Sequence, residues 1–129
     1  MSLSHPDDLS HVFAKAWGGR DAVTLAGLFA PDADFLSLTG GLASGQQNIA
    51  ELLAGEFSGA FSRARLVTGK CKLRPVGQQA VVMQQRFVLS GLIHADGSDA
   101  GRVGAIFCAT LGMNDHGWEI VAAQFVPEA

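Results

Sequence analysis

The sequence predicts an α+β domain in which three helices from the first half pack on one face of a curved antiparallel sheet, most of which the second half builds. Apolar residues recur at helical spacing up to about residue 61, and alternating, β-branched segments begin near Arg63. Short turn sequences separate these segments. Because such short connections join antiparallel neighbours, the second half should form a four-stranded meander.

Two helices are predicted to open the fold. Ser4 can cap the first helix, and Gly18-Gly19 ends it. Asp21 can cap a second, short helix, which must end before Pro31. The first helix has one apolar face, formed by Leu9, Val12, Phe13, Ala16 and Trp17.

A short strand around Phe35, Leu36 and Leu38 should follow and run into the glycine-rich turn 40–45. A third helix then has Glu56 at the border of its apolar face, an unusual place for a carboxylate. That face consists of Ile49, Leu52, Leu53, Phe57 and Phe61. The meander is expected at 63–76, 79–91, 102–113 and 118–126.

The composition indicates one soluble domain spanning residues 1–129, since 48% of the residues are hydrophobic and 16% are charged. A net charge of −3 with scattered basic residues argues against a nucleic-acid partner. No apolar run approaches the roughly 20 residues of a membrane span, and the acidic N-terminus does not resemble a signal peptide. We therefore expect a cytoplasmic protein without a membrane partner.

Neither a metal nor a cofactor is expected. The histidines His5, His11, His94 and His116 never fall four residues apart on one helix, and no dinucleotide or phosphate-loop motif is present. Cys71 and Cys108 lie in apolar, strand-like segments without C-x-x-C spacing. The sequence predicts that both are buried free thiols.

Three motifs resemble the SnoaL-like branch of the nuclear-transport-factor-2-like superfamily, and most closely its SgcJ/EcaC group. They are the run from Phe13 to Phe35, the segment Gly45-Gln-Gln-Asn-Ile49, and the segment Trp118-Glu-Ile120-Val-Ala-Ala-Gln124. The resemblance implies a cone-shaped α+β barrel with an apolar pocket between the helices and the concave sheet. It also implies a homodimer through the other face of the sheet. The superfamily hosts isomerases, dehydratases, hydrolases and binding or assembly domains, so it does not define one function.

Ketosteroid isomerase, which is similar in fold, uses an aspartate base and an oxyanion hole of a tyrosine and a protonated aspartate. Phe13 occupies the place of that tyrosine, and the chain contains no tyrosine. The place of the base falls near Leu38. This mechanism is therefore excluded.

Three polar residues within apolar strands are candidates for ligand binding: Arg86, Gln124 and Thr110. A guanidinium at Arg86 suits a carboxylate or an enolate-like oxygen, although the residue could instead lie on the solvent or dimer face. Gln124 shares the strand face of Ile120 and should point into the cavity. A β-bulge in one of these strands would reverse such an assignment.

Asp34 and His94 are the candidates for moving a proton. Each also suits a solvated position, Asp34 at a strand start and His94 beside the loop 95–101. Aromatic residues should fill the core first and line the pocket second; these are Trp17, Phe29, Phe35, Phe57 and Phe61.

Two functions remain open from the sequence. In the first, the domain binds a small apolar organic molecule and can catalyse proton transfer on a carbonyl compound. In the second, it is a non-catalytic homodimerisation or assembly module with a residual pocket. No pair of titratable residues is brought together by spacing alone, so the sequence does not decide whether the protein is an enzyme.

Overall fold

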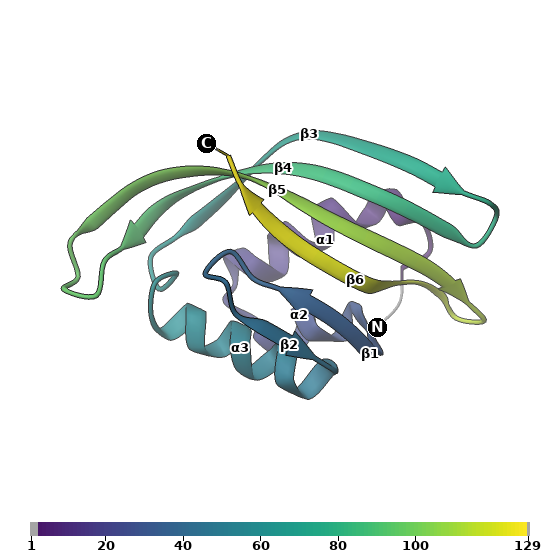
Figure 1. Ribbon diagram of the computed structural model, residues 1–129, viewed down its shortest axis with the longest axis horizontal. Helices are drawn as coiled ribbons and strands as arrows, with labels where there is room; N and C mark the ends of the chain where they lie inside the picture. Colours follow the sequence, from purple (N-terminus) through teal and green to yellow (C-terminus); the bar gives the residue numbers. More distant parts are fainter. Residues whose placement is uncertain (1–2, 129) are drawn as a thin grey trace.

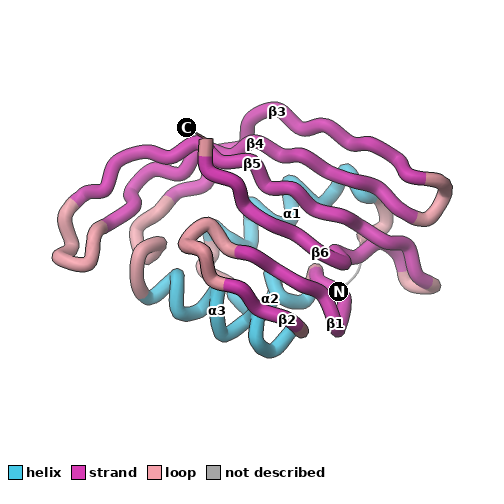
Figure 2. The backbone as a smooth tube through the Cα atoms, in the orientation of Figure 1, coloured by secondary structure: helices cyan, strands magenta, loops and turns pink. Residues whose placement is uncertain are grey.

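The computed structural model, which describes residues 3–128, has three helices on one face of a six-stranded sheet (Figures 1 and 2). The predicted α+β class is confirmed. A 3₁₀ turn (Pro6–Asp8) precedes the helices, which are α1 (Leu9–Gly18), α2 (Ala22–Gly27) and α3 (Gln46–Ser58). The strands are β1 (Phe29–Leu36), β2 (Leu42–Ser44), β3 (Arg65–Val76), β4 (Ala80–Ile93), β5 (Asp99–Asn114) and β6 (Gly117–Pro127).

The strand order is β2-β1-β6-β5-β4-β3, and the sheet is mixed. β1 pairs with β6 in parallel, whereas every other neighbouring pair is antiparallel. The purely antiparallel sheet expected from the sequence is therefore wrong at one junction. The parallel pair forms because β2, α3 and strands β3 to β5 separate β1 from β6, a connection long enough to return the chain in the same direction.

The helix boundaries follow local capping. Asp21 caps α2 as predicted, with its Oδ1 accepting a hydrogen bond from the Thr24 backbone N–H at 3.0 Å. Ser4 does not cap α1, because the 3₁₀ turn intervenes and Asp8 takes the N-cap position. α3 ends at Ser58.

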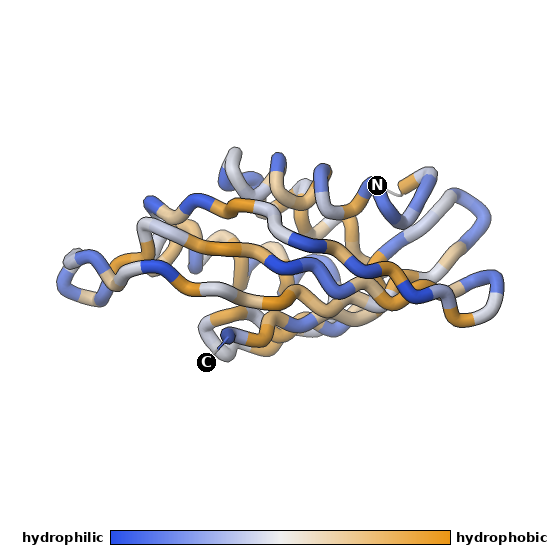
Figure 3. Tube along the Cα trace, turned by 90° about the horizontal axis from the view of Figure 1, so that it is seen from above, coloured by the Kyte–Doolittle hydropathy of each residue, from blue (hydrophilic) through white to orange (hydrophobic). Residues whose placement is uncertain are grey.

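The core lies between the helices and the inner face of the sheet, the face turned toward them. Hydrophobic and hydrophilic residues alternate along the long strands, as Figure 3 shows. Phe13 of α1 sits over this face, with its ring centroid 4.6 Å from that of Phe107. Phe107 in turn lies 4.9 Å from Phe125. These rings fill the space between α1 and the middle of the sheet.

A β-bulge in β6 changes which side chains face the core. The register with β5 shifts between the pairs Leu111–Ile120 and Thr110–Ala122, so Val121 has no partner in β5. Ile120 therefore faces inward, as do Ala123 and Phe125.

No helix among residues 3–128 combines the length and the apolar character needed to cross a membrane.

Candidate functional site

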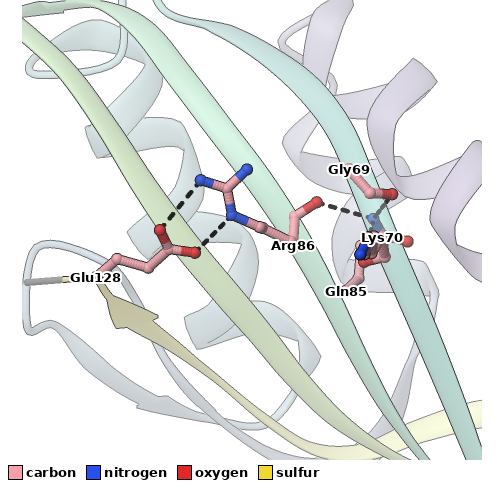
Figure 4. A network of polar contacts seen from close by, with 5 residues as sticks. All are labelled: Gly69, Lys70, Gln85, Arg86 and Glu128. Atoms are coloured by element: carbon pink, nitrogen blue, oxygen red, sulfur yellow. Dashed lines mark hydrogen bonds and ion pairs between the residues drawn. The ribbon is translucent and has the colours of Figure 1, made fainter.

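Arg86 lies on the outer face of the sheet, the face turned away from the helices, and not in an interior pocket. Alternation along β4 directs Met83, Gln85 and Phe87 inward and Arg86 outward. Its guanidinium donates to the Glu128 carboxylate, from Nε at 2.6 Å and from Nη2 at 3.1 Å (Figure 4). Arg86 was predicted either to bind a ligand in the pocket or to lie on the solvent or dimer face. The structure places it on the outer, solvent-accessible face.

Gln124 and Thr110 also lie on the outer face. The bulge at Val121 turns Gln124 away from the face of Ile120, so both Gln124 and Thr110 are exposed. The expectation that Gln124 points into the interior is wrong for this reason.

Three of the expected polar residues nevertheless come together. Asp34, Thr110 and Gln124 line one hollow of about 420 Å³ on the outer face. Asp34 accepts a hydrogen bond from Ser44 Oγ at 2.6 Å. Leu42 and Val82 add apolar surface to this hollow.

His94 lies elsewhere. It is exposed at the start of the β4–β5 loop, where its backbone N–H donates to the Ser98 carbonyl oxygen at 2.8 Å. Asp34 and His94 belong to different parts of the molecule, Asp34 to the outer face of β1 and His94 to this hairpin loop.

The five aromatic residues are core residues: Trp17, Phe29, Phe35, Phe57 and Phe61 are all buried. Trp17 contacts Phe57 edge to face at 5.3 Å and Phe61 at 5.5 Å. Arg20 covers this group, with its guanidinium carbon 5.5 Å from the Trp17 ring. The packing role expected first for these residues is the one the structure shows.

A cleft between α1 and β3 contains polar residues that the sequence analysis did not select. Its volume is about 540 Å³. It lies on the inner side of the sheet, where the edge strand β3 and its neighbour β4 meet the first half of α1. It is lined by Asp7, Ser10, His11, Ala14, Leu66, Thr68, Gly69, Cys71, Leu73 and Gln85.

Gln85 connects the walls of this cleft. Only 1% of its surface is exposed, and its Oε1 accepts a hydrogen bond from Ser10 Oγ at 2.6 Å. Its Nε2 donates to the carbonyl oxygens of Gly69 at 3.0 Å, Lys70 at 3.3 Å and Arg86 at 2.8 Å. Gly69 and Lys70 belong to a bulge between Thr68 and Cys71, so Gln85 ties this bulge to α1.

The signal for Gln85 was present in the sequence. It shares one strand face with Met83 and Phe87. A polar side chain at an inward position of an apolar strand indicates a buried hydrogen-bonding site. Cys71 also faces the cleft, with its Sγ 3.7 Å from Ser10 Oγ, and it is exposed rather than buried. The thiol was expected to be buried, but β3 is an edge strand. Cys108 is half-buried on the outer face, and both thiols are free.

Glu56 is buried on α3, with 7% of its surface exposed. Its Oε2 accepts a hydrogen bond from Thr39 Oγ1 at 2.7 Å, while Oε1 has no partner among the described residues. Thr39 in turn shares a hydrogen bond with Ser37 Oγ at 3.0 Å. Burial raises the pKa of the Glu56 carboxyl, and the hydroxyl contacts only partly oppose this.

Within residues 3–128, no three His, Cys, Asp or Glu side chains cluster as metal ligands would.

Comparison with known proteins identifies the fold. No family model matches the chain, and no curated protein matches it. A nuclear-transport-factor-2-like protein with a cystatin-like fold from Novosphingobium aromaticivorans superposes with a TM-score of 0.74 at 16% identity, covering 92% of this chain and 76% of that chain. These values establish a shared fold.

Two further solved structures show the range of proteins with this architecture. A protein from the same organism, provisionally named a scytalone dehydratase, has a TM-score of 0.79 at 13% identity, with 95% of this chain and 81% of that chain covered. A provisionally named calcium/calmodulin-dependent protein kinase II association domain from Xanthomonas campestris has a TM-score of 0.77 at 15% identity, with coverage of 95% and 84%. The chain thus has the cystatin-like, nuclear-transport-factor-2-like fold.

Proposed function

We propose that the protein is a small-molecule-binding domain and that its ligand binds in the cleft between α1 and β3. The observation that carries this proposal is a concave site between a helix and the inner face of the sheet, with the buried Gln85 tied to Ser10 in its wall. Its volume of about 540 Å³ falls within the range of known small-molecule sites. The resemblance to the nuclear-transport-factor-2-like superfamily, which implies a pocket between the helices and the sheet, supports this place for the ligand.

The chemistry of the cleft suits a small, mainly apolar organic ligand. Ala14, Leu66 and Leu73 supply apolar surface, and Ser10 and Thr68 supply hydroxyl groups. Proton transfer on a bound carbonyl compound would depend on His11 and Asp7, which line the cleft. Asp34 and His94, the sequence candidates for this role, lie outside it.

Nuclear magnetic resonance titration of ¹⁵N-labelled protein with 2-acetonaphthone tests the proposal. We expect shifts confined to amides of the cleft, and Ala14→Trp should abolish them by filling the space. Ala54→Trp, on the exposed face of α3, is the matched control and should bind as the wild type does. Shifts confined to the outer face, or unchanged affinity in Ala14→Trp, would overturn the proposal.

Homodimerisation through the outer face is the second candidate function. No helix within residues 3–128 covers this face, and it exposes apolar side chains, including 74% of Leu42 and 58% of Val67. The solved structure named as an association domain has the same architecture. Native mass spectrometry should give a dimer that Leu42→Glu converts to a monomer, whereas Val23→Glu on α2 leaves it intact. A monomeric wild-type protein would reject this function.

A further inference from the structure

Positive charge gathers at one edge of the sheet. The segment 57–95 contains six of the nine basic residues of the chain and no aspartate or glutamate. β3 is the edge strand beside β4, and these two strands carry five of the six: Arg65, Lys70, Lys72, Arg74 and Arg86. Strand pairing thus brings together basic residues that are scattered along the sequence.

This basic face, defined as Lys70, Lys72, Arg74 and Arg86, lies on the outer side of the sheet. Lys72 pairs with Gln84 and Arg74 with Val82, and both partners point outward on β4. Lys70, Lys72 and Arg86 line a hollow of about 410 Å³. Within residues 3–128, the side chains of Lys70, Lys72 and Arg74 form no ion pair.

The face already holds one carboxylate, that of Glu128. Arg86 binds it through two nitrogens, and the backbone N–H of Glu128 donates to the Gly104 carbonyl oxygen at 2.8 Å. Gly104 lies under the ion pair. A Cβ built there would come within 2.7 Å of Glu128 Oε2 and 3.2 Å of Arg86 Nη2. The missing side chain therefore makes room for a carboxylate across β5.

The Arg86–Glu128 contact is open to exchange. The two side chains are 43% and 36% exposed, and ion pairs in water contribute little net stability. A carboxylate from another molecule meets the same planar guanidinium, with Lys70 and Lys72 beside it.

We propose that the basic face binds an acidic, carboxylate-rich peptide segment of a partner protein. Glu128 occupies one carboxylate position of this face when the partner is absent. Carboxylates of the bound segment pair with Lys72, Arg74 and Lys70, and one of them displaces Glu128 from Arg86. A carboxylate is the group that the structure holds at this face, in the bidentate geometry that a guanidinium favours.

Fluorescence anisotropy with fluorescein-labelled hexaglutamate tests the proposal, at about 20 mM and about 150 mM salt. We expect binding that weakens with salt and falls about tenfold or more in the variant Lys72→Glu/Arg74→Glu. Glu128→Gln should bind several-fold more tightly because it frees Arg86. Lys15→Glu, on the exposed face of α1, changes the net charge elsewhere and should have little effect.

Four results would each overturn the proposal: no hexaglutamate binding at low salt, equal losses in Lys15→Glu and in the double variant, no gain in Glu128→Gln, or tighter binding of an oligothymidylate or of phosphatidylserine vesicles. Circular dichroism of each variant separates lost binding from lost folding. The 2-acetonaphthone titration concerns the inner side of the sheet, so the two proposals can fail independently.

Discussion

Replacement of Gln85 by leucine tests whether its buried hydrogen bonds hold β3 against α1. Leucine has a similar size but removes the acceptor for Ser10 and the donor to three carbonyl oxygens. Gly69 and Lys70 are exposed, so water can reach the carbonyl groups of the bulge after the substitution. The loss of free energy of unfolding is then comparable to the cost of leaving one buried polar group without a hydrogen bond.

We therefore expect Gln85→Leu to lower the free energy of unfolding by about 2 kcal/mol. For a chain of this length, that loss lowers Tm by roughly 8 °C. Ser10→Ala removes only one of the hydrogen bonds and should lower the free energy by about 1 kcal/mol. Because both substitutions remove the same Ser10–Gln85 contact, the double variant should lose less than the sum of the two.

Urea denaturation followed by circular dichroism measures all three values. A Gln85→Leu variant within about 0.5 kcal/mol of the wild type would refute the reasoning, since a surface position typically gives such a change. Strict additivity in the double variant would refute the coupling between α1 and β4.

Two further predictions concern backbone geometry and a buried charge. Gly91 has φ +77, and a Cβ there would fall on the Arg63 carbonyl oxygen, whereas Gly97 has φ +85 and open space around it. In thermal melts, Gly91→Ala should therefore destabilise the protein clearly more than Gly97→Ala, which carries only the left-handed backbone cost of about 1 kcal/mol; equal effects would contradict the close approach. Burial raises the pKa of Glu56 above its ordinary 4.5, so the folded state binds its proton more tightly than the unfolded chain does. The stability of the wild type should fall as pH rises from about 4.5 through the folded-state pKa, by about 1.4 kcal/mol for each unit of difference. In urea melts across this pH range, the free energy of unfolding of Glu56→Gln should not show this fall. Parallel pH profiles for the wild type and the variant would contradict the role assigned to Glu56.

Sequence patterns predicted the helices and the meander well because each depends on local periodicity or capping. The Asp21 cap and the apolar face of α1 are examples. β2 was missed because its three residues, Leu42–Ser44, lie within the segment 40–45 that was predicted as a glycine-rich turn, and they carry no period of their own. Its place is determined by pairing with β1, a contact beyond local sequence.

The candidate site was harder to predict for two physical reasons. One extra residue at Val121 reverses the face of every later side chain in β6, and this moved Gln124 from the expected interior to the outer surface. The cleft combines residues of α1 with residues of β3 and β4, more than 50 positions further along the chain. Only tertiary packing brings Ser10 to Gln85, which the strand alternation alone marks as an inward polar residue.

The central place of β6 has a consequence for how the protein folds. In the order β2-β1-β6-β5-β4-β3, the last strand in the sequence joins the hairpin of the first half to the meander of the second. Before β6 docks, β1 and β5 are open edges that can pair with other chains. The sheet becomes one hydrogen-bonded layer only when β6 pairs with both β1 and β5, and such long-range pairing is slow to form. During this interval, aggregation competes with folding most strongly.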